Sequence, residues 1–323
     1  MRFRYATLLT VVRYDDHTHI EIHSPWKAGR LLRQYDIAQP VRRAVVSTTA
    51  HCQLLCWLGA ERSIAGVCDA RYIQTPQVAM GIRRGSVADC GNSMAPATER
   101  IAEIGADAII VSPFEQSGGY GQLEQLGIPI IEAADYMEPS PLARAEWMRL
   151  YGIIFGCERQ ADSLFHVLDS TYTALKKLAI KQPEGRCIVT ERKTGSVWYC
   201  PGGRSTVGTL IGDAHGRYPW ADDRHSGSLT LSPEEVIDHA SHADVWMMTY
   251  AGQPPTRRSL ADEYHGYTLL GAFAHGEIYG CDTERTHYFE EVPFRPDYLL
   301  RDYIQIAHPG LNLGGLRYYH RIE

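Results

Sequence analysis

A long helical pattern between Pro141 and Gln182 constrains the fold of this chain more than any other sequence feature. From Glu158 to Gln182 no Gly or Pro interrupts the pattern, and apolar residues recur at steps of three and four. These residues are Ala161, Leu164, Phe165, Leu168, Tyr172, Leu175, Leu178 and Ala179. A helix of this length would span roughly 35 Å, about the width of a small domain. The pattern predicts either a helix that connects two lobes or one long surface helix of a single domain.

Composition allows two lobes and narrows the range of partners. The chain has 323 residues, 44% hydrophobic and 22% charged, which is enough apolar material for two ordinary cores. With a net charge of −6, the chain lacks the positive potential that attracts nucleic acid, so we expect no nucleic-acid partner. No apolar run approaches the ~18 residues of a membrane span, and Arg13 returns charge too early for a convincing signal peptide.

The eight cysteines have no spacing typical of a metal site. Cys52 and Cys56 share one helix face, and the others are scattered without a CxxC pair. We expect mostly buried thiols. The even count permits one or two disulfides but does not indicate them.

Both halves of the chain predict alternating strands and helices. In the first half, strands are expected at 44–48, 63–69, 107–112 and 127–133, and helices at 50–59 and 96–104. In the second half, strands are expected at 186–191, 197–200, 244–250 and 277–281, and helices at 205–212, 233–241 and 296–307. We therefore predict an α/β fold with mainly parallel sheets. Its parts are an N-terminal lobe (1–140) that begins with a strand-forming extension, a helical segment (141–182) and a C-terminal lobe (183–323).

Candidate binding residues follow from the expected strand ends. Ligands of open parallel sheets bind beyond the carboxyl ends of the strands. Polar and aromatic residues at or near these positions are Thr49, His51, Tyr72, Asn92, Phe114, Trp198, Tyr199 and Tyr250. Such side chains suit a large, partly apolar ligand, because stacking supplies contact area and a few polar groups set orientation. None of them forms an obvious nucleophile and base pair, so we predict no catalytic residues.

Several segments, in this order along the chain, resemble the substrate-binding proteins of ABC importers that carry iron–siderophore complexes, haem or cobalamin. The first is TERIAEIGADAIIVSPF (98–114), followed by LGIPIIEA (126–133) and PLARAEWMRLYGIIFGCERQAD (141–162). LSPEEVIDHASHADVWMMT (231–249) and YFEEVPFRPDYLLRDYIQIAHPG (288–310) complete the resemblance, which spans nearly the whole chain. Ala106 and Ala243 stand where many members have Pro, and we expect neither change to alter the fold.

The resemblance implies two Rossmann-like lobes joined by one long helix, with the ligand in a cleft between them. It also implies that one Glu on each lobe contacts basic residues of a membrane permease, here Glu99 and either Glu234 or Glu235. Two exposed carboxylates at corresponding places on the two lobes could orient the protein on a basic partner surface. The alternative is that each Glu stabilises the first turn of its helix through the helix dipole.

The resemblance further implies a cargo rather than a cofactor: a ferric siderophore, haem or cobalamin. Three arginines either neutralise the charge of an anionic siderophore or are exposed to solvent: Arg71, Arg83 and Arg84. We expect a monomer in the periplasm. One route to the membrane is a lipid anchor on a leader outside this chain.

One motif points to a different class of function. His17, His19 and His23 lie on one face if HTHIEIH is extended, and histidines at this spacing can bind zinc in hydrolases. No second metal motif of matching strength follows. We favour a half-exposed strand and keep a metal-dependent hydrolase as the alternative function.

Overall fold

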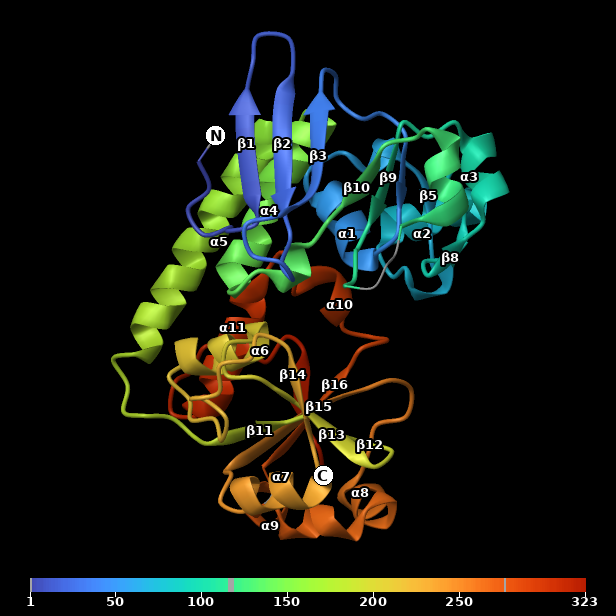
Figure 1. Ribbon diagram of the computed structural model, residues 1–323. Coiled ribbons are helices and arrows are strands. Elements are labelled where there is room, and N and C mark those ends of the chain that lie inside the picture. The colour runs from blue at the N-terminus through green and yellow to red at the C-terminus, as the bar shows by residue number, and fades with distance from the viewer. Residues whose placement is uncertain (1, 116–118, 276) are drawn as a thin grey trace. The chain divides into compact units, whose positions relative to one another are not determined.

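The computed structural model describes residues 2–115, 119–275 and 277–323 (Figure 1). The chain divides into two compact units. Unit 1 comprises Met1–Glu138, Leu142–Val167 and Phe289–Phe294, and unit 2 comprises Pro139–Pro141, Leu168–Tyr288 and Arg295–Glu323. The division falls inside the long helix, between Val167 and Leu168.

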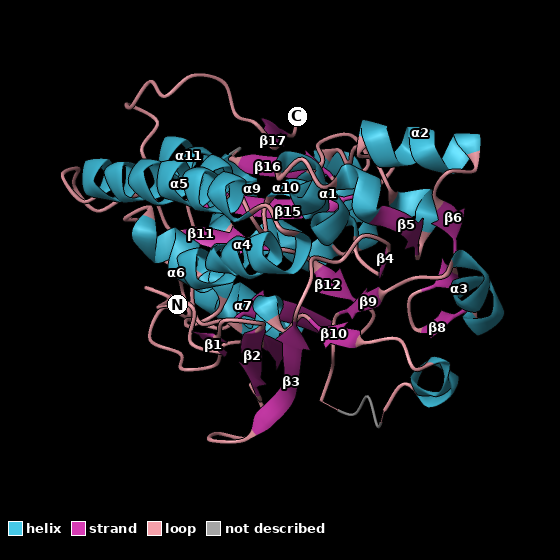
Figure 2. Ribbon diagram, turned by 90° about the horizontal axis from the view of Figure 1, so that it is seen from above, coloured by secondary structure: helices cyan, strands magenta, loops and turns pink. Residues whose placement is uncertain are grey.

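A parallel sheet forms the centre of unit 1. Its strands, in spatial order, are β10 (Ile130–Glu132), β9 (Ala108–Val111), β4 (Ala44–Val46), β5 (Ile64–Val67) and β6 (Ala88–Asp89). Short apolar strands of this kind are buried on both faces. The helices are α1 (Thr49–Trp57), α2 (Pro76–Arg84) and α3 (Thr98–Ile104), with 3₁₀ turns η1 (Glu61–Ser63), η2 (Ala70–Tyr72), η3 (Gly121–Leu126) and η4 (Asp135–Met137). Figure 2 shows α1 and α2 on one side of this sheet and α3 on the other.

The N-terminal extension is an antiparallel sheet of β1 (Leu9–Arg13), β2 (Thr18–His23) and β3 (Leu31–Ile37). One face is apolar and buried, with Val11, Ile20 and Ile22 almost without exposed surface. The residues before β1 are tied to unit 1 by two buried carboxylates. Glu146 accepts hydrogen bonds from the backbone N–H groups of residues 4–6, and Glu138 accepts them from residues 7 and 8.

The long helical pattern forms two helices, α4 (Pro141–Phe155) and α5 (Glu158–Ala179). Gly156 separates them with a φ of +68°, a left-handed conformation that glycine adopts without strain. Ala161 packs so closely on α4 that a Cβ added at Gly152 would lie 2.7 Å from the Ala161 Cβ. The second helix ends at Ala179, earlier than the Gln182 expected from the sequence.

Unit 2 contains a second parallel sheet. Its strands, in spatial order, are β11 (Ile188–Thr190), β15 (Val245–Tyr250), β16 (Ile278–Asp282) and the antiparallel β17 (Tyr319–Arg321). An antiparallel sheet consists of β12 (Lys193–Thr194), β13 (Val197–Pro201) and β14 (Ser228–Leu231). The helices are α6 (Thr206–Asp213), α7 (Pro233–Ala240), α8 (Arg257–Glu263), α9 (Gly271–His275), α10 (Tyr288–Glu291) and α11 (Pro296–Ala307), with a 3₁₀ turn, η5 (His265–Leu269). The predicted α/β class is confirmed in both units.

All eight cysteines are free thiols, so the structure contains none of the disulfides that their even number permits. Burial raises the pKa of most of them, to about 12 for Cys56 and about 11 for Cys90. Buried thiols with raised pKa values are unreactive, which agrees with the expected structural role.

Candidate functional site

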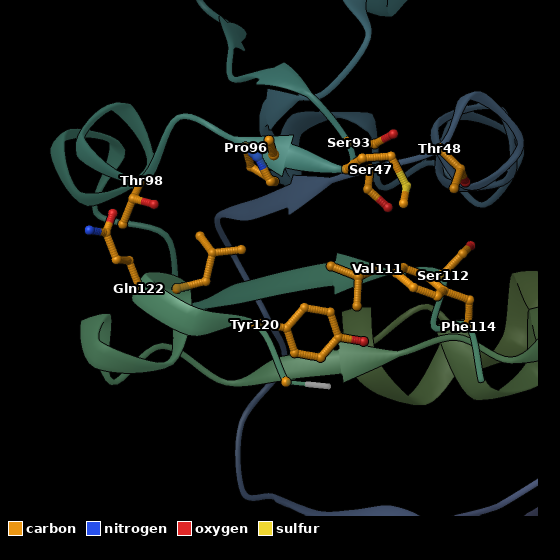
Figure 3. A pocket seen from close by; sticks show the side chains of 14 residues that line it. Ser47, Thr48, Ser93, Pro96, Thr98, Val111, Ser112, Phe114, Tyr120 and Gln122 are labelled. Carbon is orange, nitrogen blue, oxygen red and sulfur yellow. The ribbon is translucent and has the colours of Figure 1, made fainter. Parts of the chain in front are cut away.

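A pocket of about 390 Å³ opens at the carboxyl edge of the unit 1 sheet (Figure 3). Both apolar side chains and hydroxyl groups line it. The lining residues are Ser47, Thr48, Ser93, Met94, Ala95, Pro96, Thr98, Val111, Ser112, Phe114, Gly119, Tyr120, Gln122 and Leu123. Its volume lies in the range of small-molecule sites.

Parallel topology explains why these residues meet. Ser47 and Thr48 directly follow β4, and Ser112 follows β9, its neighbour in the sheet. A hairpin of β7 (Gly91–Asn92) and β8 (Ala95–Pro96) contributes a third side. The Asp69 carboxylate steadies this hairpin by accepting a hydrogen bond from the Ser93 N–H at 3.2 Å.

None of the described residues that line the pocket is Asp, Glu, Lys, Arg or His. Burial raises the pKa of Tyr120 in this wall, so its phenol stays protonated. A wall of neutral hydroxyl and amide groups can donate and accept hydrogen bonds but cannot neutralise a strongly charged ligand. The pocket therefore suits an uncharged ligand surface.

A buried polar chain lies behind Thr48. Its hydroxyl is 2.8 Å from His51 Nδ1, and His51 Nε2 is 3.0 Å from Asp135 Oδ1. The other Asp135 oxygen accepts a hydrogen bond from Arg144 Nε at 3.0 Å. Burial alone would raise the pKa of Asp135, but the charges and hydrogen bonds of His51 and Arg144 outweigh it and hold that pKa below its usual value. The carboxylate is thus ionised and fully partnered.

The structure separates the binding residues predicted in unit 1. Phe114 lines the pocket, whereas Thr49 is the first residue of α1 and lies beside it. His51 is buried behind Thr48. Tyr72 is exposed and stacks under the Arg71 guanidinium at 4.5 Å, and Asn92 is exposed on the hairpin, where its side chain accepts a hydrogen bond from the Met94 N–H.

The residues predicted in unit 2 are also distributed. Trp198 has no exposed surface and packs against Trp246 and Tyr267, so it offers a ligand no contact in this conformation. Tyr199, its neighbour on β13, points outward and is half exposed. Tyr250 ends β15 and is buried, with its hydroxyl 3.2 Å from His320 Nε2.

Sequence reasoning missed Glu191, which follows β11 at the carboxyl edge of the unit 2 sheet. Its backbone φ is +60°, a left-handed value that is strained for a residue with a long side chain. The carboxylate accepts a hydrogen bond from the Thr249 hydroxyl at 3.0 Å. Burial raises its pKa above the usual value. No sequence signal marks a positive φ at a residue other than Gly, Asn or Asp.

The three arginines considered for an anionic ligand lie outside the pocket. Arg83 and Arg84 are exposed in the last turn of α2. A helix that follows a parallel strand runs back toward the amino edge of the sheet, so this turn is at the opposite edge from the pocket.

His17, which precedes β2, and the β2 residues His19 and His23 each have a polar partner of their own. His19 Nδ1 lies 2.7 Å from Asp36, His17 Nδ1 lies 2.7 Å from Asp16, and His23 Nε2 lies 2.8 Å from the Thr10 hydroxyl. In the part of the chain that the structure describes, no group of three or more His, Cys, Asp or Glu side chains is arranged to hold a metal ion. The expected half-exposed strand is present, and the hydrolase alternative has no support.

Comparison with known proteins decides the family. The family model described as "periplasmic binding protein" matches residues 45–284, well over half of the chain. This chain belongs to the periplasmic binding protein family. Members of the family are solute-binding transport components, so the chain is not an enzyme, in agreement with the prediction from the sequence.

Two relatives of this periplasmic binding protein are uncharacterised lipoproteins of Methanocaldococcus jannaschii. One is 23% identical over 232 residues, which cover 71% of this chain and 54% of the relative. The other is 24% identical over 301 residues, which cover 89% of this chain and 75% of the relative. The chain thus spans about half the length of the first relative. No helix within the described residues is long and apolar enough to cross a membrane.

Solved periplasmic binding proteins share the fold. A haem-binding protein of Pseudomonas aeruginosa matches with a TM-score of 0.67 and 15% identity, covering 88% of this chain and 98% of that protein. A catecholate-siderophore-binding protein of Vibrio cholerae matches with a TM-score of 0.64 and 17% identity, covering 84% and 96%. A vitamin B12-binding protein of the same organism matches with a TM-score of 0.61 and 12% identity, covering 83% and 97%.

Proposed function

We propose that this protein is the solute-binding component of an ABC importer, and that it captures a metal chelate of the siderophore, haem or cobalamin type and delivers it to the membrane permease. The family match over residues 45–284 carries the proposal. The solved relatives that bind haem, a catecholate siderophore and vitamin B12 support this range of cargo.

The unit 1 pocket is the proposed cargo surface of that unit. Its wall offers apolar contact from Val111, Phe114 and Leu123 and hydrogen bonds from Ser47 and Ser112. A chelate wraps its metal in organic groups and presents a similar mixture of apolar edges and polar atoms. Residues at the carboxyl ends of β4 and β9 thus suit its outer surface.

Glu99 and Glu234 are the proposed contacts with the permease. Each is exposed in the first turn of a helix, Glu99 in α3 and Glu234 in α7. The helix dipole stabilises both carboxylates, and neither one is within ion-pair distance of a basic group among the described residues. Both therefore remain available to a basic partner surface.

We assign the protein to the periplasmic side of the membrane as a monomer, anchored by lipid like its lipoprotein-named relatives. The names of both relatives support the anchor. A β-octyl glucoside extraction of cells, with and without alkaline washing, would separate an anchored form from a freely soluble one.

Titration of the purified chain tests the cargo. The panel is haem, cyanocobalamin, ferric enterobactin and ferrioxamine B. The readouts are the Soret absorption for haem and isothermal titration calorimetry for the others. Fluorescence of Trp198 is a poor contact probe because its side chain is buried.

Saturable one-to-one binding by one chelate is expected at submicromolar concentration, which corresponds to a binding free energy on the order of −8 kcal/mol or stronger. Absence of binding across the panel contradicts the proposed cargo.

A further inference from the structure

Glu191 stands out in unit 2 because its backbone is strained where the sheet meets its ligand edge. Parallel strands β11, β15 and β16 end together, and Glu191 is the first residue after β11. Its N–H donates to the Met247 carbonyl at 2.7 Å, and its own carbonyl accepts from Trp246 Nε1 at 2.6 Å. These bonds hold the left-handed conformation, which a glycine would adopt without strain.

The side chain is an acid without a cationic partner. Oε2 accepts hydrogen bonds from the Thr249 hydroxyl and, at 3.4 Å, from the Thr249 N–H. Its neighbour Arg192 is committed to Glu263 at 2.8 Å. Among the described residues no Lys, Arg or His lies within ion-pair distance of the Glu191 carboxylate.

Apart from Arg192, whose charge acts to lower the pKa of Glu191, the titratable groups around this carboxylate are mainly neutral. The titratable groups near enough to feel its charge include Tyr288, Tyr303 and Tyr319, whose phenols are buried and protonated, and the thiols of Cys200 and Cys281. Burial accordingly raises the pKa of Glu191. A charge in such surroundings destabilises the folded chain unless a ligand pairs with it.

We infer that Glu191 contacts the cargo at the carboxyl edge of unit 2 and selects a chelate that presents a positively charged or N–H donor group. This inference rests on the proposed function and narrows its cargo class. A ferric hydroxamate with a free ammonium group, or a corrinoid with amide side chains, can donate to the carboxylate. Haem carries propionates and a ferric tris-catecholate is anionic, so both would place negative charge against it.

The first arm of the test needs no ligand. Glu191→Gln keeps the shape and an acceptor for Thr249 but removes the charge, and Glu184→Gln on the exposed segment before β11 is the matched control. Because the folded-state pKa of Glu191 is raised, its charge lowers stability above the unfolded value and has no effect well below it. We expect Glu191→Gln to raise the thermal midpoint at pH 7 but not at pH 4, and Glu184→Gln to change neither. A lower midpoint at pH 7 means that the fold needs the carboxylate, and overturns the inference.

The second arm compares ferrioxamine B, its N-acetylated form, cyanocobalamin and haem. We expect the wild-type chain to favour ferrioxamine B over the acetylated form, and Glu191→Gln to weaken binding of the preferred probe about tenfold or more. Wild-type affinity should fall as the pH drops through the raised pKa of Glu191, whereas the Gln variant should show no such fall.

Unchanged affinity in Glu191→Gln overturns the inference but leaves the proposed function intact. If no probe binds, the proposed cargo fails, and the stability arm still decides whether Glu191 is structural.

Discussion

Asp135 in unit 1 is fully buried and Glu191 in unit 2 is partly buried, both near the carboxyl edge of their sheets, and their partners differ. Asp135 is bonded to His51 and Arg144, and its pKa is lowered. Among the described residues, the Glu191 carboxylate accepts hydrogen bonds from Thr249 alone, and burial raises its pKa. The first charge belongs to the fold, because its partners neutralise it. The second has no cationic group within ion-pair distance among the described residues, which is a pattern expected at a functional site.

The largest effect is expected from removing the paired acid. Asp135→Ala leaves Arg144 without its anion and His51 without an acceptor for Nε2, so we expect a loss of about 3–5 kcal/mol in the free energy of unfolding. Urea denaturation measures it. The matched control is Asp36→Ala on β3, an exposed partner of His19, for which a change of less than about 1 kcal/mol is expected.

The pH dependence of stability provides a second test of the difference between Asp135 and Glu191. A carboxyl group whose folded pKa is lowered stabilises the protein above its unfolded pKa, and this stability is lost as the pH falls through the folded value. For Asp135 the loss begins below the ordinary value of 3.8. We expect acid denaturation of the wild-type chain to steepen there, and the Asp135→Ala variant to lack that component. An equal acid dependence in both chains would mean that Asp135 is not the ionised partner of Arg144.

A smaller effect is expected in the glycine-rich segment before α6 in unit 2. A Cβ at Gly203 would lie 2.5–2.6 Å from the carbonyl oxygens of Trp220, Ala221 and Asp223, which are backbone atoms and cannot rotate away. Gly203→Ala should cost about 1–3 kcal/mol. Gly212→Ala, inside α6 with open space around its Cβ, should instead stabilise by about 0.5–1 kcal/mol. Thermal unfolding of both variants separates packing from helix propensity, and equal shifts would refute the packing argument.

The smallest effect on stability is expected at the two exposed acids proposed for the permease. Glu99→Lys and Glu234→Lys should each lower the free energy of unfolding by less than about 1 kcal/mol, since only the interaction with the helix dipole is lost. Cargo affinity should be unchanged, while uptake into cells or vesicles containing the cognate permease should fall. Loss of cargo affinity in either variant would place that residue at the cargo surface and reject its assignment to the permease.

Hydrophobic patterning predicted most of the fold. Short apolar runs predicted β4, β9 and β15, and the uninterrupted amphipathic segment predicted α5, because burial of an apolar face depends on local periodicity. The pattern did not show that Gly156, a single left-handed residue, separates α4 from α5. It also assigned Pro96 to a helix, although Pro96 belongs to β8, which pairs with β7 in a hairpin.

The candidate site was predicted less well. The rule that ligands bind at the carboxyl ends of parallel strands led to Phe114 and to the neighbourhood of Thr48. It could not distinguish a side chain that faces solvent from one that faces the core. Trp198 and Tyr199 are adjacent in the sequence, yet the first is buried and the second exposed, because side chains alternate across a strand and the register depends on pairing with β14.

The sequence by itself determined the α/β class and the long helix, since these follow from composition and periodicity along the chain. Only the tertiary structure decided which acids are paired. His51, Asp135 and Arg144 come from three separate segments, and Glu191 meets Thr249 across neighbouring strands. Whether a buried charge is neutralised depends on distances between segments remote in the chain, and those distances exist only after the chain has folded.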